Sequence, residues 1–300
     1  MKLPDVSIIT VNYNGLWDTY EFIDSLQLHL KINYELIVVD NGSFSDELNG
    51  MTCLYPGIIS LRSRYNLGFS GGNNLGIKHS CGRYLLFLNN DTYITDNSIS
   101  ELISFMDSHP QVGGVSPKLK YSDGRNIIQY AGSTALSNIT IRNQVIGQGE
   151  YDKGQFDTAC CTHFLHGAAM LVRREVIERV GLMPEIYFLY YEEIDWSSRI
   201  KENGYELWYI PQCTVYHKES RTVGKDSCIK VYYMSRNRLL YSLRNRKGID
   251  RILSHLYLLY IVGGRDVLRY IIRGDFNLAI GVIRGHWSYF NLFIKRKLLY

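Results

Sequence analysis

Residues 84–95, YLLFLNNDTYIT, join an apolar run to two amides and an acid. The run from Tyr84 to Leu88 has the length and the unbroken apolar character of a strand that is buried on both faces. Asn89, Asn90 and Asp91 follow it directly. Because Asn and Asp favour the tight bends that follow strands, this cluster by itself indicates either a turn or a ligand-binding edge.

Three similar apolar runs precede this one, at residues 6–11, 35–39 and 58–62. Helical patterns lie between the runs, near residues 17–30 and up to about Cys81, and another lies near 96–108. Strands that alternate with helices predict parallel strands joined by right-handed crossovers. The first part of the chain is therefore predicted to be an α/β fold with a mostly parallel sheet flanked by helices.

Polar side chains end each of these four predicted strands. Asn12 and Asn14 follow the first strand, Asp40 follows the second, and Asn66 with a glycine cluster follows the third. In open α/β sheets, ligands bind beyond the carboxyl ends of the strands. Turn chemistry explains one such end by itself, but four on one edge favour a binding cleft.

The middle of the chain, roughly residues 111–220, is less regular. VGGVSPKLKY predicts another strand, and ELWYIP predicts a strand with VYHKES just beyond it. A helix is expected to start near Glu192 and to end at Gly204, because glycine commonly follows the last residue of a helix.

Composition bounds the class of protein. The 300 residues are 46% hydrophobic and 21% charged, which supplies a core and excludes a disordered chain. The six cysteines show no CxxC spacing, so we expect free thiols in a reducing compartment. The amino terminus does not resemble a signal peptide, and no run of about 18 apolar residues predicts a transmembrane helix.

The charge is distributed unevenly. Residues 226–300 contain 14 Lys and Arg against 4 Asp and Glu, whereas the rest of the chain contains 19 against 25. This basic tail predicts two or three helices that mix aromatic, apolar and basic positions, a composition that suits an anionic membrane surface. A helical cap or a homodimer interface is the alternative. Nucleic acid is not expected as a partner, because the body is acidic and carries no binding motif for it.

The ordered motifs VSIITVNYNG, ELIVVDNGS, YNLGFSGGNN, YLLFLNNDT, HGAAMLVRREV, FLYYEEIDWSSR and VYHKES resemble those of glycosyltransferase family 2, especially its bacterial rhamnosyltransferase-like branch. They span residues 6–220. The resemblance implies a Rossmann-like GT-A fold, a nucleotide-sugar donor, a divalent metal and inversion at the anomeric carbon. We therefore expect a catalytic domain at 1–225, with a nucleotide-sugar half to about 110 and an acceptor half after it, and a helical extension at 226–300.

The resemblance assigns nucleotide and donor contacts to the first half. Asp40 can accept a hydrogen bond from the imide N–H of uracil or thymine, although an Asx turn in DNGS is the plain alternative. The glycines are expected to let the backbone approach the donor, and a helix start there offers N–H groups to an anion. The expected nucleotide and donor residues are Thr10, Asn12, Asn14, Asp40, Asn66, Gly71, Gly72, Asn73 and Asn90.

Asp91 matches the last acid of the metal-binding Asp-x-Asp of the family, and by resemblance His217 completes the site. The chain departs from the family at Asn89, where an amide replaces the first acid. An amide oxygen still ligates Mg²⁺ or Mn²⁺, but without charge. Imidazole suits Mn²⁺ better than Mg²⁺, so His217 favours manganese.

Inversion requires a base that takes the proton of the acceptor hydroxyl. By resemblance this base is Glu193, with Asp195 as the alternative. Neighbouring carboxylates raise a pKa towards a useful value, although acids are also common at helix N-termini for electrostatic reasons. Tyr190 is a further aromatic candidate for stacking on a sugar. The expected acceptor or sugar contacts are His166, Gly167, Tyr191, Glu192 and Trp196.

Together these features predict a metal-dependent inverting transferase with a glycan or lipid-linked acceptor in surface-polysaccharide synthesis, and the resemblance implies dTDP-rhamnose as the first donor to consider. UDP-hexose and UDP-galactofuranose are alternative donors. The enzyme would be cytoplasmic and peripheral on the inner face of the membrane. The second hypothesis is a nucleotide-sugar-binding protein without turnover, which is supported by the absence of the first acid of the Asp-x-Asp motif at Asn89. A nucleotidyltransferase is the third, but TVNYNGLWD lacks its basic glycine-rich loop.

Overall fold

The computed structural model describes residues 3–218 and 227–294, and the chain divides into two compact units. The first unit comprises Met1–Thr134, Gln144–Glu185 and Trp196–Glu219, and the second comprises Ala135–Asn143, Ile186–Asp195 and Ser220–Tyr300. Two segments far from the C-terminal tail in sequence therefore belong to the same unit as the tail. A boundary near residue 225 stays a prediction.

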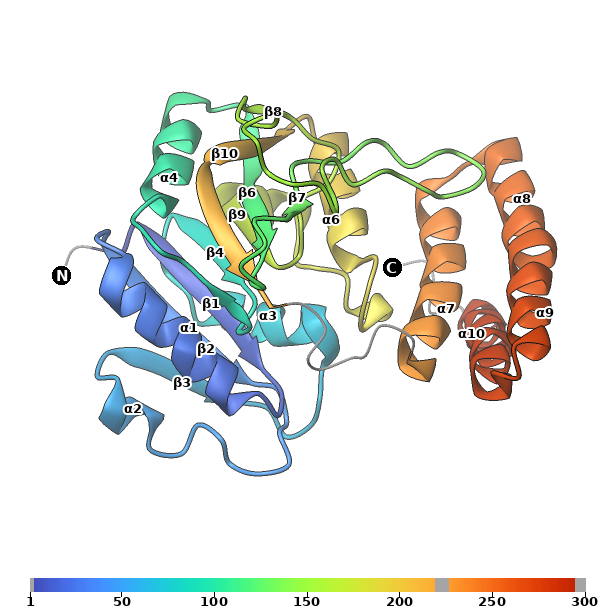
Figure 1. The fold of residues 1–300 in the computed structure, drawn as a ribbon, viewed down its shortest axis with the longest axis horizontal. Helices are drawn as coiled ribbons and strands as arrows, with labels where there is room; N and C mark the ends of the chain where they lie inside the picture. Colours follow the sequence, from blue (N-terminus) through green and yellow to red (C-terminus); the bar gives the residue numbers. More distant parts are fainter. Residues whose placement is uncertain (1–2, 219–226, 295–300) are drawn as a thin grey trace. The chain divides into compact units, whose positions relative to one another are not determined.

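A mixed sheet forms the centre of the first unit, with the strand order β3-β2-β1-β4-β9-β6-β10-β5 (Figure 1). Strand β1 pairs in parallel with β2 and β4, and β2 pairs in parallel with β3. The four apolar runs at the start of the chain are therefore parallel neighbours, as predicted. The strands are β1 Val6–Asn12, β2 Tyr34–Asp40, β3 Ile58–Arg62, β4 Tyr84–Leu88, β5 Thr92–Tyr93, β6 Val112–Tyr121, β7 Ile128–Tyr130, β8 Cys160–Cys161, β9 Ala169–Arg173 and β10 Glu206–His217.

The second half of the sheet differs from the predicted alternation. Strand β9 lies between β4 and β6 and is antiparallel to both, and β5 is antiparallel to β10. Strand β10 also continues past the predicted ELWYIP segment to His217, with a register shift between Ile210 and Thr214 that accommodates Pro211. His217 is thus the last residue of a strand rather than a residue beyond one.

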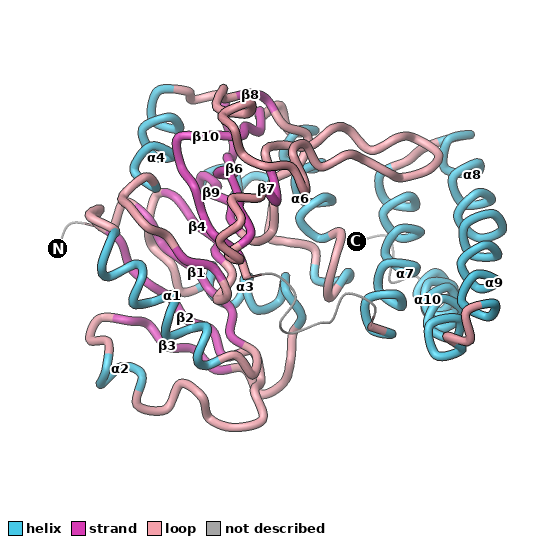
Figure 2. The backbone as a smooth tube through the Cα atoms, viewed as in Figure 1, coloured by secondary structure: helices cyan, strands magenta, loops and turns pink. Residues whose placement is uncertain are grey.

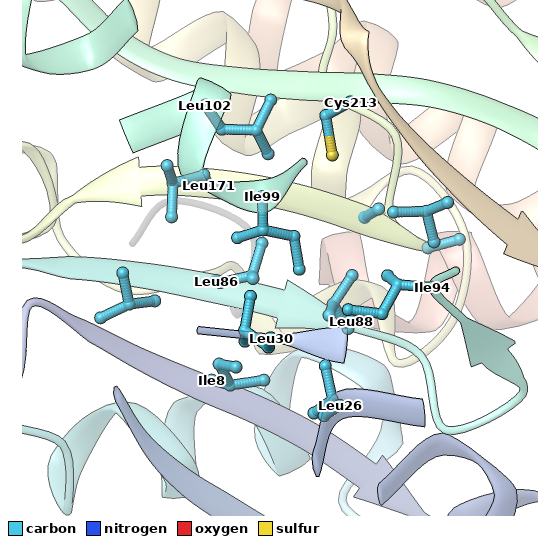
Figure 3. Close-up of a cluster of buried hydrophobic side chains, with 14 of the residues drawn as sticks. Ile8, Leu26, Leu30, Leu86, Leu88, Ile94, Ile99, Leu102, Leu171 and Cys213 are labelled. Atoms are coloured by element: carbon cyan, nitrogen blue, oxygen red, sulfur yellow. The ribbon is translucent and has the colours of Figure 1, made fainter. Parts of the chain in front are cut away.

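Helices cover both faces of this sheet and create two apolar layers. Alternate strand residues point to opposite faces, so Ile8 joins one layer and Ile9 the other. Helices α1 and α4 supply the first layer, and Figure 3 shows Leu26, Ile99 and neighbouring side chains within it. The second layer packs under α3, α5 and α6. The helices are α1 Leu16–His29, α2 Met51–Leu54, α3 Gly68–Lys78, α4 Ile99–Ser108, α5 Arg174–Val180 and α6 Glu192–Glu202.

The C-terminal residues of the second unit are helical (Figure 2). They form α7 Cys228–Asn245, α8 Gly248–Leu256, the π-helical segment η2 Tyr257–Gly263, α9 Gly264–Ile272 and α10 Phe276–Ile294. Because α8, η2 and α9 follow one another without a break, residues 227–294 form three continuous helical segments, within the predicted two or three. Within residues 3–218 and 227–294, no helix is long and apolar enough to span a bilayer.

Candidate active site

Asp91 and His217 are brought together by strand pairing. In the antiparallel pair of β5 and β10, His217 stands opposite Thr92, the residue that follows Asp91. His217 Nε2 lies 3.1 Å from Asp91 Oδ1, and the backbone N–H of Lys218 donates to the carbonyl of Asp91 at 3.0 Å. A carboxylate and an imidazole that are 126 positions apart in the sequence therefore share one edge of the sheet.

Gln129 on β7 orients the imidazole. Its Oε1 lies 2.9 Å from His217 Nδ1 and can accept a hydrogen bond from an Nδ1–H, the tautomer in which Nε2 is able to ligate a metal. Both side chains are buried, which restrains the ring. A ligating histidine whose other nitrogen donates to an oxygen is the usual arrangement in metal sites. No motif includes Gln129, so its role could not be inferred from the sequence.

The donor set fits a divalent metal. Asp91 and His217 offer one charged oxygen and one nitrogen, and the side chain of Asn89 makes no hydrogen bond to any residue within the described ranges. Its backbone N–H is held by the carbonyl of Ala168 at 3.0 Å, which fixes the start of the turn. Among the described residues, no three His, Cys, Asp or Glu side chains gather as a metal cluster. Asp91 and His217 would therefore bind a metal that takes its remaining ligands from substrate and water.

His166 and Gly167 belong to the same part of the first unit. The imidazole of His166 lies edge-on to that of His217, with ring centroids 6.4 Å apart. Its Nδ1 accepts from the backbone N–H of Ala168 at 3.1 Å, and Gly167 occupies the tight turn between them. Burial, together with the neighbouring His217, lowers the pKa of His166 to about 3, so this ring is neutral at physiological pH.

Two buried polar atoms near the carboxyl ends of β1 and β2 lack hydrogen-bond partners in the described part of the chain. They are Thr10 Oγ1 and Asp40 Oδ2. The Asx turn is present, because Asp40 Oδ1 accepts from the backbone N–H of Ser43 at 3.0 Å. Asp40 Oδ2 lies 3.3 Å from Arg62 Nε. One carboxylate oxygen thus shapes the turn, and the other keeps its capacity to accept a hydrogen bond.

Asn12 and Asn14 tie the end of β1 to the loop after β2. Asn12 Nδ2 donates to Glu47 Oε2 at 2.7 Å, and Asn14 Oδ1 accepts from the backbone N–H of Phe44 at 2.9 Å. Asn14 also has a positive φ of 53°, which Asn tolerates better than most residues. These amides therefore hold together the loops at the carboxyl edge of the sheet. Glu47 is a hydrogen-bond partner that was not predicted from the sequence.

Asn90 and Asn66 also connect neighbouring loops. Asn90 Nδ2 donates to Thr19 Oγ1 at 3.0 Å, which joins the turn after β4 to helix α1. Asn66 Oδ1 accepts from Asn41 Nδ2 at 3.1 Å and from the backbone N–H of Gly68 at 2.8 Å. The predicted polar ends of β1, β2, β3 and β4 therefore form one connected edge of hydrogen bonds.

The glycines of YNLGFSGGNN serve packing. A Cβ on Gly72 would lie 2.8 Å from Val11 Cγ1, and a Cβ on Gly71 would lie 2.6 Å from Leu67 Cβ. The absent side chain of Gly72 thus lets α3 approach β1 closely, whereas that of Gly71 leaves room for Leu67 at the start of α3. Asn73 is buried and donates to the carbonyl of Phe69 at 2.9 Å, so it also serves α3. Packing of the helix against the sheet is therefore sufficient to explain these glycines, and the expected approach of the donor stays a prediction.

The acid pair lies at the start of α6, in the second unit. Glu192 is buried and Glu193 is partly accessible, and one oxygen of each, Oε2, has no hydrogen-bond partner within the described residues. Burial raises the pKa of Glu193 to about 7. Burial and then the charge of Glu193 raise the pKa of Glu192 well above its usual value. Near neutral pH Glu193 is therefore poised to exchange a proton, next to a Glu192 whose pKa is raised in the same direction.

Asp195 has a different environment, although it is only two residues away. Its Oδ2 accepts from Tyr187 Oη at 2.7 Å, from Arg244 Nε at 2.8 Å and from Asn245 Nδ2 at 3.1 Å. The side chain is fully buried. An acid neutralised by a guanidinium and occupied by three donors is suited to holding the helix start in place, so Glu193 is the better candidate base.

The aromatic candidates for sugar stacking are packed against protein. Trp196 is a core residue of the first unit, with its ring edge-on to Phe87 and its Nε1–H bonded to the carbonyl of Gly181 at 2.9 Å. Its faces are covered and cannot stack on a sugar. Tyr191 is also buried and packs against Tyr241 in the second unit. Helix periodicity places Trp196 on the buried side of α6, a fact that the motif alone did not reveal.

The family model of "Glycosyl transferase family 2" matches residues 7–181, more than half of the chain. A hexosyltransferase of low-salt glycan biosynthesis, Agl10 of Haloferax volcanii, is 30% identical over 275 residues, which cover 89% of this chain and 85% of the relative. An N-acetylglucosaminyl-diphospho-decaprenol L-rhamnosyltransferase of Mycobacterium tuberculosis is 23% identical over 239 residues, which cover 73% of this chain and 78% of that protein.

Solved structures share the fold. The mannosyltransferase PcManGT from Pyrobaculum calidifontis, in complex with GDP-Man and Mn²⁺, superposes with a TM-score of 0.59 at 15% identity, over 97% of this chain and 88% of that one. TarS residues 1–349 of S. aureus superposes with a TM-score of 0.55 at 15% identity, over 95% and 92% of the two chains. The fold is therefore that of the GT-A glycosyltransferases, and the chain belongs to glycosyl transferase family 2.

Proposed function

We propose that this protein is a metal-dependent inverting glycosyltransferase. It transfers a sugar from a nucleoside diphosphate to a hydroxyl of a glycan or lipid-linked acceptor, in the synthesis of a surface polysaccharide. The observation that carries the proposal is the pair of Asp91 and His217, held at the carboxyl edge of the sheet with Gln129 behind the imidazole. A bound Mn²⁺ or Mg²⁺ would supply positive charge to the diphosphate leaving group.

Glu193 acts as the base in this proposal. Its carboxylate accepts the proton of the acceptor hydroxyl while the hydroxyl oxygen bonds to the anomeric carbon. The bond between that carbon and the diphosphate oxygen breaks, and nucleoside diphosphate leaves from the opposite face. A base is most effective when its pKa is close to the working pH, and burial raises the pKa of Glu193 to about 7.

Thr10 and Asp40 are the proposed contacts to the nucleotide base, because each keeps a buried oxygen without a hydrogen-bond partner among the described residues. An acceptor at Asp40 suits the imide N–H of thymine or uracil. dTDP-rhamnose is the first donor to test, and the name of the mycobacterial relative supports it. UDP-hexose and UDP-galactofuranose are the alternatives, and the name of the Haloferax relative supports a hexose.

Release of nucleoside diphosphate from a panel of dTDP-, UDP- and GDP-sugars, with Mn²⁺ or Mg²⁺ and with chelator, tests the proposal. We expect turnover with one donor class, loss of turnover with chelator, and strong loss in Asp91→Asn. Asp123→Asn is the matched control, since Asp123 is an exposed acid that pairs with Arg125. Tight nucleotide binding without turnover on any donor would instead support a nucleotide-sugar-binding protein.

Helix α10 presents an apolar stripe to solvent. Phe276, Ile280, Ile283, Trp287 and Ile294 recur at helical spacing, and the exposed fractions reach 67% for Trp287 and 74% for Ile294. Such a stripe on one helix is typical of an interfacial segment.

The positive charge around this apolar stripe favours its binding to an anionic lipid surface. Arg265, Arg269, Arg273 and Arg284 are exposed on α9, at its end and on α10, within a tail that contains 14 basic and 4 acidic residues. Each basic residue near an anionic membrane contributes about 1 kcal/mol of attraction. We therefore propose peripheral attachment to the inner face of the cell membrane, where lipid-linked acceptors lie.

Co-flotation with vesicles tests this attachment. We expect binding to vesicles that contain phosphatidylglycerol, weak binding to phosphatidylcholine alone, and a large loss of binding in Trp287→Asp. Trp17→Asp is the matched control, because Trp17 is 78% exposed on α1 of the first unit. A dimer in light scattering that Trp287→Asp converts to monomer, without vesicle binding by the wild type, would assign the stripe to a second copy of the chain.

A further inference from the structure

The backbone just before the acid pair is held in an unusual conformation. Phe188, Tyr190 and Tyr191 have φ values of 64°, 69° and 76°, a region that aromatic residues rarely adopt. These residues belong to Ile186–Tyr191, here named the acid-pair loop, which leads directly into Glu192 and Glu193. Such a backbone persists only where surrounding contacts determine it, and it sets the direction in which the following side chains leave the helix start.

Asn237 of α7 supplies those contacts. Its side chain is fully buried, and Nδ2 donates to the carbonyls of Tyr187 at 3.0 Å, Leu189 at 2.7 Å and Tyr190 at 2.9 Å. An amide NH₂ has two hydrogens, so the three carbonyls share both of them. One side chain thus holds the acid-pair loop on either side of the positive-φ residue Phe188.

Arg236 fixes the orientation of that amide. Its Nε donates to Asn237 Oδ1 at 2.8 Å, which leaves the NH₂ group of Asn237 directed at the loop. Its Nη2 donates to the carbonyls of Ile186, at 3.1 Å, and Tyr187. The guanidinium is buried, and four carbonyls of the acid-pair loop therefore receive their hydrogen bonds from two adjacent residues.

Other residues on α7 hold the loop side chains and the helix start. The ring of Tyr233 stacks on Phe188 with centroids 5.2 Å apart, and Arg244 pairs with Asp195 two positions after Glu193. Helix α7 therefore contacts both the acid-pair loop, which precedes Glu192 and Glu193, and Asp195, which follows them. This role of α7 was not predicted from the sequence, because α7 lies in the basic tail.

We propose that Asn237 is a positioning residue for catalysis, which orients the Glu193 carboxylate by fixing the acid-pair loop. The inference rests on the proposed role of Glu193. It also makes the first helix of the tail part of the catalytic apparatus rather than an attachment segment only. The opposing interpretation is an ordinary buried asparagine that stabilises the second unit without affecting the chemistry.

Asn237→Asp tests the inference, because it keeps the shape of the side chain and replaces the NH₂ donor with an oxygen that faces three carbonyls. Displacing a reacting group by about 1 Å costs up to about 100-fold in rate, so we expect kcat to fall ~10- to 100-fold with little change in the KM of the sugar nucleotide. The pH dependence of kcat should shift, and amide exchange should accelerate within Ile186–Asp195. Arg236→Lys, which keeps the charge but loses the planar fork, should have the same effects to a smaller degree.

Ser242→Ala is the control for a purely structural loss. Ser242 is equally buried on α7, and its hydrogen bonds among the described residues join it to Ser254 Oγ, at 2.9 Å, and to His255 rather than to the acid-pair loop. The proposal is overturned if Asn237→Asp, or Arg236→Lys where the first variant does not fold, keeps the wild-type kcat and pH profile. It is also overturned if either variant loses rate only as Ser242→Ala does, in proportion to the folded fraction. Full activity in Glu193→Gln would instead refute the role of the base, which distinguishes the two failures.

Discussion

The ionisation of Glu193 should control the reaction rate between about pH 5.5 and pH 8. Only the ionised carboxylate accepts a proton, and burial raises its pKa to about 7. With one titrating group at that value, about 3% of Glu193 is ionised at pH 5.5 and about 90% at pH 8. Because the pKa of Glu193 is raised, the rate should fall as the pH falls through 7. From about pH 5.5 to 8 the rate should therefore rise about 30-fold.

The measurement is the rate of nucleoside diphosphate release with saturating donor, acceptor and metal at each pH. Glu193→Gln keeps the size of the side chain but cannot accept the proton, so the rate should fall about 10²- to 10⁴-fold and lose its dependence near pH 7. Glu192→Gln is the matched control. Because burial and the charge of Glu193 raise the pKa of Glu192 well above its usual value, replacement of Glu192 by the neutral amide should leave the midpoint near 7.

A wild-type rate that is flat from about pH 5.5 to 8 would refute this reasoning, since it would show that no group with a raised pKa limits the reaction. A Glu193→Gln variant that retains a tenth or more of the rate at about pH 8 would refute the assignment of the base. In that case Asp195 would not be the automatic substitute, because Tyr187, Arg244 and Asn245 already occupy its carboxylate.

Three further outcomes follow from the packing and the metal pair. Gln129→Ala should raise the Mn²⁺ concentration for half-maximal activity about 10- to 100-fold, because the imidazole of His217 loses its orienting partner; an unchanged titration would contradict the orienting role. Trp196→Ala should lower the free energy of unfolding by about 3–5 kcal/mol, measured by denaturant titration, because it empties a core position; a loss below about 1 kcal/mol would contradict its burial. Gly72→Ala should cost about 1–3 kcal/mol in the same titration, because the new Cβ would lie 2.8 Å from Val11 Cγ1, and an unchanged stability would contradict close packing of α3.

Local patterns predicted the first half of the fold well. An unbroken apolar run is sufficient to indicate a strand buried on both faces, and alternation with helices is sufficient to indicate parallel neighbours. For this reason β1 to β4 and helices α1, α3 and α4 occur near their expected positions, whereas the short helix α2 was not expected. The polar residues at the ends of these strands could be placed on one edge, because parallel strands share the direction in which they end.

The antiparallel strand β9 and the full length of β10 were not predictable in the same way. HGAAMLVRREV carries no sign of its direction, which depends on pairing with β4 and β6 from distant parts of the chain. The extension of β10 to His217 depends on pairing with β6 on one side and on the other with the two-residue strand β5, which is too short to leave a periodic pattern. Trp196 was likewise predicted to contact a sugar, because the motif does not show that its side chain lies on the buried side of α6.

The sequence by itself determined β1 to β4, the helices α1, α3 and α4, and the polar edge, and it supplied the acids and the histidine as candidate site residues. These features depend on side-chain chemistry and on short-range periodicity. Only the tertiary structure decided that His217 meets Asp91, that Gln129 orients it, and that Asn237 holds the loop before Glu193. Each of these contacts joins residues that are tens of positions or more apart, and long-range pairing and burial, rather than local preference, bring such residues together.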